Sequence, residues 1–303
     1  MGDAAIRTEG LTKRFGAFEA LSGLDLVVEP GEVLGYLGPN GAGKTTTIRL
    51  LLDLARPSAG RAEIFGLDTQ RDAVAVHRRV AYVPGEATLW PSLTGAETLH
   101  LLGRVHGRLD PGYRDELIGR FQLDPNKKVR AYSKGNRQKL SLIAALMTRA
   151  ELLVLDEPTS GLDPLMEQVF RECVVEAKDR GQTLLLSSHI LSEVEVVCDR
   201  VAILRAGKLV ETGTLAELRH LAALSVEATL RGPVPDLSGV SGISNLRIDG
   251  NRLQCQVLGP VEPLLAALAG AGVEKLLSRE PSLEELFLAH YGEVDRSPVE
   301  VPA

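Results

Sequence analysis

The apolar residues in the first two thirds of this chain form two kinds of pattern. Continuous apolar runs at 31–37 (GEVLGYL) and 151–157 (ELLVLDE) predict strands that are buried on both faces, as in a parallel sheet. Helix-like spacing of apolar residues follows at 45–54 (TTTIRLLLDL) and again at 139–149 (KLSLIAALMTR). Strands that alternate with helices in this way predict an α/β fold with a mostly parallel sheet.

The residues after position 220 follow a different pattern. Leu224–Leu230 and Leu246–Val257 alternate apolar and polar residues like strands, and a turn is predicted within the second segment at Asp249-Gly250. Val261–Ala271 is a candidate for a short apolar helix, and Pro281–His290 is a candidate for another. These elements predict a small α+β domain.

Charge and turn residues locate the boundary between the two parts. Residues 221–303 hold 11 acidic and 6 basic residues, whereas residues 1–220 hold 29 acidic and 28 basic residues. The segment 231–242 (RGPVPDLSGVSG) has the composition of a loop. We therefore expect one domain at 1–222 and a second at 223–303.

Composition restricts the classes of function. Hydrophobic residues make up 44% and charged residues 24%, which is ordinary for a globular protein with a sizeable core. The net charge of −6 without a long basic block argues against nucleic acid as a partner. Three scattered cysteines show no metal-ligand spacing, so we expect them to be reduced. No signal-like N-terminus or stretch of 18 apolar residues is seen, so we expect a membrane role to depend on a partner.

The motif with the clearest chemistry is GPNGAGKT at 38–45, which fits the phosphate-loop pattern G-x-x-x-x-G-K-[ST] without a gap. Its glycines allow a backbone path along which successive N–H groups converge on phosphate oxygens. Lys44 supplies a positive charge for the β- and γ-phosphates, and the Thr45 hydroxyl can bind Mg²⁺. The predicted nucleotide-binding residues of this motif are Gly38, Pro39, Asn40, Gly41, Ala42, Gly43, Lys44, Thr45 and Thr46.

Two acids end the second apolar run. Asp156 and Glu157 follow the run at the C-terminal end of a predicted parallel strand, where ligands of open α/β sheets bind. Asp156 is a candidate ligand of Mg²⁺, directly or through water, and Glu157 is a candidate base for the attacking water. Such a pair alone is more often a plain strand end, but the phosphate loop in the same chain favours the functional interpretation.

A second anion site is predicted at the start of the helix around 139–149. The preceding segment, 132–138 (YSKGNRQ), places Ser133 at an N-cap position, next to a glycine and free backbone N–H groups. As a lone motif this is a weak signal, because any capped helix looks similar.

The order of these pieces over roughly residues 4–220 resembles the ATP-binding cassette family. The resemblance implies a P-loop NTPase fold with an antiparallel β subdomain and a helical subdomain at about 90–150. YSKGNRQ resembles the family signature LSGGQ-R-Q. That match implies ATP contacts by Ser133, Lys134, Gly135 and Asn136.

Three further segments carry the resemblance. KRFG at 13–16 looks like the family's aromatic loop, which implies that Phe15 stacks on adenine; the alternative is a core phenylalanine. SGLD at 160–163 looks like the D-loop, which implies a nucleotide contact for Asp163. LSSHIL at 186–191 looks like the switch, which implies that His189 contacts the γ-phosphate during catalysis.

The chain departs from the family pattern in two places. Its signature has Lys134 where the family usually has glycine and Asn136 where it usually has glutamine, which adds a positive charge near the phosphates. The family places a Mg²⁺-sensing glutamine at position 85, but this chain has Gly85 followed by Glu86. Either Glu86 serves as the metal ligand or water fills the position.

The resemblance implies an ATPase that uses ATP and Mg²⁺. One cassette supplies two half-sites, so two copies, expected as a homodimer, would close on two ATP molecules. The C-terminal segment is similar to that of ATPase subunits of type-2 exporters for drugs, antibiotics or lipid-like compounds. That group works through a separate transmembrane permease, on the cytoplasmic face of the cell membrane. The alternatives are an importer ATPase and a soluble cassette ATPase that acts on ribosomes or DNA.

Overall fold

The computed structural model describes residues 4–107, 110–189, 194–220 and 224–279. The chain divides into two compact units, Met1–Gly213 and Thr214–Ala303, and each is described by itself. The sequence prediction places the boundary later, between residues 222 and 223.

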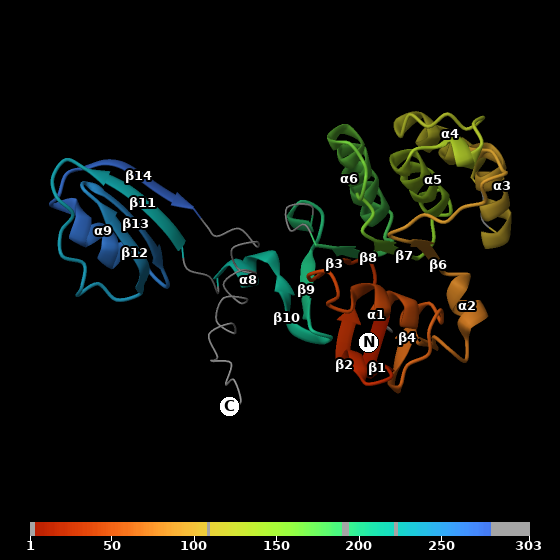
Figure 1. Ribbon diagram of the computed structural model, residues 1–303, viewed down its shortest axis with the longest axis horizontal. Helices are drawn as coiled ribbons and strands as arrows, with labels where there is room; N and C mark the ends of the chain where they lie inside the picture. Colours follow the sequence, from red (N-terminus) through yellow and green to blue (C-terminus); the bar gives the residue numbers. More distant parts are fainter. Residues whose placement is uncertain (1–3, 108–109, 190–193, 221–223, 280–303) are drawn as a thin grey trace, which may run out of the picture. The chain divides into compact units, whose positions relative to one another are not determined.

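A six-stranded sheet lies at the centre of the first unit (Figure 1), in the strand order β10-β9-β3-β8-β7-β6. The strands are β3 (Val33–Leu37), β6 (Val80–Val83), β7 (Leu152–Asp156), β8 (Thr183–Ser188), β9 (Arg200–Arg205) and β10 (Lys208–Thr214). The pairs β6·β7, β7·β8, β8·β3 and β3·β9 are all parallel. Every residue of β3, β7 and β8 is buried, because both faces of the sheet are covered. The predicted α/β fold with a mostly parallel sheet is confirmed.

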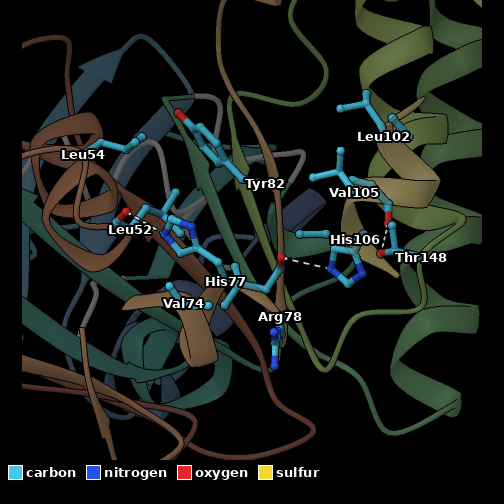
Figure 2. Close-up of a pocket in the computed structure, with 14 residues that line it drawn as sticks. Leu52, Leu54, Val74, His77, Arg78, Tyr82, Leu102, Val105, His106 and Thr148 are labelled. Carbon is cyan, nitrogen blue, oxygen red and sulfur yellow. Dashed lines mark hydrogen bonds between the residues drawn. The ribbon is translucent and has the colours of Figure 1, made fainter. Parts of the chain in front are cut away.

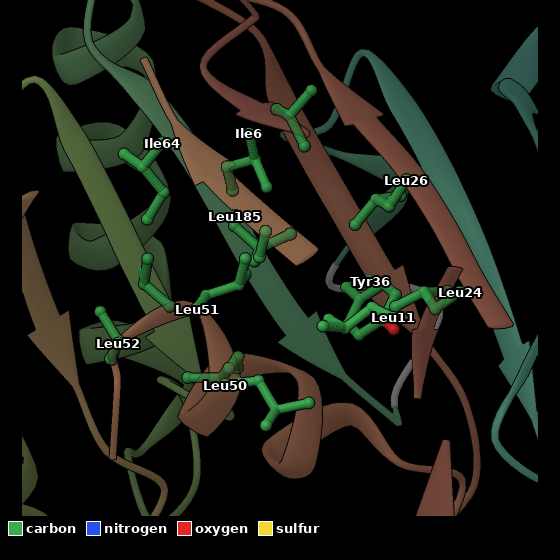
Figure 3. Close-up of a cluster of buried hydrophobic side chains, with 14 of the residues drawn as sticks. Ile6, Leu11, Leu24, Leu26, Tyr36, Leu50, Leu51, Leu52, Ile64 and Leu185 are labelled. Carbon is green, nitrogen blue, oxygen red and sulfur yellow. The ribbon is translucent and has the colours of Figure 1, made fainter. Parts of the chain in front are cut away.

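An antiparallel sheet of the order β2-β1-β4-β5 packs against the same unit's core. Its strands are β1 (Ile6–Phe15), β2 (Phe18–Val28), β4 (Ala59–Ile64) and β5 (Leu67–Asp68). The core cluster joins Leu11 and Leu24 of this sheet to Tyr36 of β3 and Leu51 of helix α1 (Lys44–Leu51), as Figure 3 shows. The buried hydroxyl of Tyr36 lies 3.0 Å from the hydroxyl of Thr47, so it keeps a hydrogen-bond partner in the core.

Helices α3 (Gly95–His106), α4 (Pro111–Arg120) and α5 (Lys134–Leu146) group together beyond β6 (Figure 1). Other helical segments among the described residues of this unit are α2 (Ala73–His77), the 3₁₀ turn η1 (Val129–Ala131) and α6 (Pro164–Asp179), besides the short helical stretch at 194–195. Thr94 starts α3 with a capping box, since its side chain accepts from the Glu97 N–H while the Glu97 carboxylate accepts from the Thr94 N–H. Side-chain oxygens of Asp110, Ser133 and Asp163 cap α4, α5 and α6.

The second unit contains a four-stranded antiparallel sheet in the order β12-β13-β11-β14. Its elements are α8 (Leu215–His220), β11 (Leu224–Leu230), β12 (Ile243–Asp249), β13 (Arg252–Val257), α9 (Glu262–Ala269) and β14 (Val273–Arg279). The strand order is that of a ferredoxin-like β-α-β-β-α-β unit in which the segment 231–242 replaces the first helix. The predicted turn at Asp249-Gly250 joins β12 to β13, and the predicted helix at 281–290 lies outside the described residues.

The core of the first unit yields a prediction about stability. We expect Leu51→Ala to lower the free energy of unfolding by about 2–5 kcal/mol, because it removes a fully buried side chain from between the two sheets. Denaturant unfolding of the variant measures the change. Leu54→Ala is the matched control, since that side chain is 55% exposed. Equal unfolding midpoints for the two variants would contradict the packing described here.

Candidate nucleotide-binding and catalytic site

The phosphate loop joins the end of β3 to the start of α1. A Cβ on Gly38 would lie 2.5 Å from the Leu204 carbonyl oxygen, so only glycine fits this close backbone approach. Gly43 has φ +113°, and a Cβ there would also lie 2.9 Å from the Ala20 carbonyl oxygen. The loop therefore needs glycine at these positions to hold its curved backbone at the N-terminus of α1.

Lys44, the first residue of α1, is buried in the loop. Its ammonium donates hydrogen bonds to the carbonyl oxygens of Gly38 (2.6 Å) and Pro39 (3.2 Å), and lies 3.9 Å from the Glu157 carboxylate. Burial lowers the pKa of Lys44, while the negative charges of Glu157 and Asp156 act in the opposite direction. The ammonium thus lies at the loop, against the acids at the end of β7.

Asp156 is buried at the end of β7 and faces two hydroxyl groups. The Thr45 hydroxyl donates to one of its carboxylate oxygens at 2.9 Å, and the Ser187 hydroxyl donates to the other. Sequence reasoning missed Ser187, although it stands two residues before His189 at the end of a strand. The register Asp156↔Ser187 between β7 and β8 brings it to the site. Hydroxyl and carboxylate oxygens are the donors that Mg²⁺ prefers, so Thr45 and Asp156 fit the predicted metal.

Glu157 and His189 lie in contact. The Nδ1 atom of His189 is 3.2 Å from a carboxylate oxygen of Glu157. Glu157 has φ +46°, in the left-handed region that residues other than glycine seldom adopt, and its N–H donates to the backbone carbonyl of Ser187 at 3.1 Å. The structure therefore brings together the predicted base and the predicted switch residue, which are 32 positions apart.

Phe15 lies at the edge of the phosphate loop, and its ring is 55% exposed, so it is not a core residue. Phe15 and Phe18 line a cavity of about 240 Å³ together with the phosphate loop and Glu157. Phe18, which is 64% exposed, was missed by sequence reasoning, since a single aromatic residue in a strand gives no signal. Exposed rings at this position can stack on a planar base, and adenine stacking by Phe15 stays a prediction.

The signature segment begins α5. The side-chain oxygen of Ser133 accepts from the Asn136 N–H at 3.2 Å, and the Lys134 ammonium donates to the Ser160 hydroxyl at 3.2 Å. A Cβ on Gly135 would lie 2.5 Å from the Gly161 carbonyl oxygen. This segment is thus fastened to the loop that follows Glu157.

The described lining of the cavity at the phosphate loop does not include the signature segment. None of residues 133–136 is among the described residues that line the cavity at the phosphate loop. Asp163 caps α6 by accepting from the Met166 N–H at 3.1 Å, and its nucleotide contact stays a prediction. The ATP contacts expected for the signature residues therefore stay a prediction.

Gly85 leaves space beside Asp156. A Cβ on Gly85 would lie 3.5 Å from the Asp156 carbonyl oxygen and 3.8 Å from a carboxylate oxygen, both ordinary contact distances. A side chain at position 85 would therefore begin next to the Asp156 carboxylate, the predicted metal ligand. Glu86 is exposed, and its role as a metal ligand stays a prediction.

A larger apolar cavity of about 590 Å³ lies between α2 and β6 on one side and α3 and α5 on the other (Figure 2). Val74 and Val105 line it and are 72% and 78% exposed. His77 and Arg78 also line it, and the His77 ring lies 2.9 Å from the Leu52 carbonyl oxygen.

None of the described helices is long and apolar enough to cross a membrane.

Comparisons with known proteins agree with this geometry. Residues 21–160 match the family described as ABC transporter. The chain is 40% identical to the daunorubicin resistance ATP-binding protein DrrA3 of Streptomyces coeruleorubidus, over 95% of this chain and 96% of that protein. It is 39% identical to the bacitracin transport ATP-binding protein BcrA of Bacillus licheniformis, over 68% of each. The solved structure of an ATP-binding subunit of an ABC transporter matches with a TM-score of 0.67 and 32% identity, over 71% of this chain and 92% of that one.

The position of Lys44 predicts its effect on nucleotide affinity. We expect Lys44→Ala to weaken ATP binding by about 10- to 100-fold, because a charge-assisted hydrogen bond to phosphate contributes roughly 1.5–3 kcal/mol. Isothermal calorimetry with ATP measures the affinity. Lys127→Ala is the control, since this lysine is 62% exposed and its near partner is Asp124. Unchanged affinity in Lys44→Ala would remove the residue from the phosphate site.

Proposed function

The chain belongs to the ABC transporter family as an ATP-binding ATPase subunit, and from this premise we propose that it drives export of a drug-like or antibiotic compound through a separate transmembrane permease. The similar proteins are named for daunorubicin resistance and for bacitracin transport, which supports export over the importer alternative. The subunit would then act at the cytoplasmic face of the membrane, held there by the permease.

The hydrolytic step follows from the residues at the end of β7. Glu157 accepts a proton from water as the water oxygen forms its bond to the γ-phosphorus, and the bond to the β,γ-bridging oxygen breaks. The contact with His189 orients the Glu157 carboxylate. Lys44 offers positive charge to the phosphate oxygens, and Thr45 and Asp156 would hold the metal ion. Mg²⁺, when bound, neutralises charge on the phosphates.

The observation that carries the proposal concerns the lining of the cavity at the phosphate loop. Asp156 contacts Thr45 of the phosphate loop, and His189 contacts Glu157, which lines the cavity at that loop. None of residues 133–136 is among the described residues that line this cavity. A second copy can supply its signature to the first copy's nucleotide, and the reverse, in an isologous pair. The subunit is therefore proposed to act as a homodimer that closes on two ATP molecules.

The apolar cavity in Figure 2 is the proposed docking surface for the permease. An amphipathic helix fits an apolar cavity of this kind. Exposed apolar side chains of the cavity, such as Val74 and Val105, gain contacts when such a helix binds there. Arg78 gives the cavity a positive charge, which favours an acidic side chain on the partner segment. The cavity adjoins β6 and therefore the sheet that ends at the catalytic acids.

Removing the proposed base tests the catalytic assignment. We expect Glu157→Gln to slow steady-state ATP hydrolysis by about 10²- to 10⁴-fold while ATP still binds, because an amide cannot accept the proton. Phosphate release and calorimetry measure the two properties. Glu116→Gln in α4 is the control, since its carboxylate is exposed and far along the chain from the acids. Hydrolysis at the unaltered rate in Glu157→Gln would exclude the role of base.

A charge placed in the apolar cavity tests the docking surface. We expect Val105→Glu to weaken association with the permease by at least about tenfold, because burial of an unsatisfied polar group costs roughly 1–3 kcal/mol and burial of an unpaired charge costs more. Co-purification with the membrane protein measures recovery of the complex. The matched control is Val175→Glu, at a position in α6 that is 47% exposed and outside the cavity. If both variants recover the same amount of complex, the cavity is not the docking surface.

A further inference from the structure

Among the residues that the structure describes, helix α9 and the loop 231–242 cover one face of the second unit's sheet and leave the other face uncovered. Leu264 and Leu268 of α9 and Leu237 of the loop 231–242 pack on the covered face, where they form a core with Val226 and Leu253. The opposite face lines an open hollow of about 450 Å³. Its side chains are mostly exposed and mostly polar or charged.

The strand registers arrange this uncovered face into rows that cross all four strands. Each row takes one residue from β12, β13, β11 and β14, in that order. The first row is Asp249, Arg252, Thr229 and Lys275. The second row is Arg247, Gln254, Glu227 and Leu277. In the first row the two end residues therefore carry opposite charges, and in the second row one end residue is charged and the other is apolar.

We propose that this face binds the same face of a second copy of the chain, around a two-fold axis parallel to the strands. Such an axis places β12 over β14 of the other copy and keeps each row over itself. Asp249 then meets Lys275 of the other copy, and this ion pair forms twice. In the second row, Gln254 and Glu227, which share a hydrogen bond of 3.2 Å within each copy, meet the same pair of the other copy. The apolar stem of Arg247 covers Leu277, which is 51% exposed.

The charge pattern also favours this axis over a two-fold axis that runs across the strands through the second row. A two-fold axis across the strands, through the second row, would place Glu227 over Glu227 and Arg247 over Arg247. Like charges directly opposite each other destabilise a contact. The axis parallel to the strands avoids both of these like-charge pairs.

The area of the face explains how such a contact would act. Four strands spaced about 4.8 Å apart, over five residues of about 3.4 Å each, cover about 300–400 Å² per copy. This is below the roughly 800 Å² per partner of a stable interface, so the contact is weak alone. This proposal rests on the homodimer proposed above. The contact between the two sheets would keep the two ATPase units at a high local concentration.

Opposite charge reversals test the pairing in the full-length chain. Asp249→Lys alone sets lysine against lysine, and Lys275→Asp alone sets aspartate against aspartate. We expect each variant to dimerise about 3- to 10-fold more weakly in sedimentation velocity, with and without Mg²⁺–ATP. In an equimolar mixture of the two variants, every lysine of one chain meets an aspartate of the other. The mixture is therefore expected to dimerise about as tightly as the unaltered chain.

The control is Glu262→Lys, which makes the same change of charge on α9, on the covered side of the sheet. Three results would overturn the proposal. The mixture could dimerise no more tightly than either variant alone, or the variants could lose no more dimer affinity than the control does. The unaltered chain could also stay monomeric with and without nucleotide. ATP hydrolysis is measured in parallel. Unchanged dimerisation of the two variants, with normal hydrolysis per subunit, would contradict only this contact. An unaltered chain that does not hydrolyse ATP would contradict the proposed function.

Discussion

The parallel register of β3, β8 and β7 is the constraint on which the site depends. It pairs Leu37 with Ser188 and Asp156 with Ser187, so the strands end together at one edge of the sheet. A shift of one residue in a strand turns its side chains to the opposite face, so the carboxylate of Asp156 could no longer meet the hydroxyl groups of Thr45 and Ser187. The buried faces of these strands fix that register, because a shift would have to repack apolar side chains on both sides of the sheet.

At the same edge of the sheet, the positive charge of Lys44 lies close to the negative charges of Glu157 and Asp156, and all three side chains are at least partly buried. Lys44 is taken out of water by the fold of its own loop and is kept near Glu157 and Asp156, which favour its charged form. Backbone carbonyl oxygens of the phosphate loop accept hydrogen bonds from the Lys44 ammonium, so its donors have partners within the loop. Charge that is fixed in advance by packing needs little rearrangement when an anion arrives.

Much of this could be predicted from the sequence because it is local. The phosphate loop, the strand that ends in two acids and the capped start of α5 each lie within a few consecutive residues, and their backbone chemistry is readable there. Ser187, Phe18 and the apolar cavity could not be read in this way, because each acquires its surroundings from segments far apart in the chain. The loop 231–242 was predicted from its glycines and prolines, but its burial of Leu237 in the second core depends on strands that follow it.

The left-handed backbone conformation of Glu157 determines which residues fit this position without strain. A side chain with a Cβ is disfavoured at φ +46°, and glycine or asparagine would adopt it with less strain. Substitution for thermal stability alone would therefore favour those residues, which lack the carboxylate. With Glu157 as the proposed base, glutamate at this position trades stability for activity, and selection for heat resistance alone would act against it.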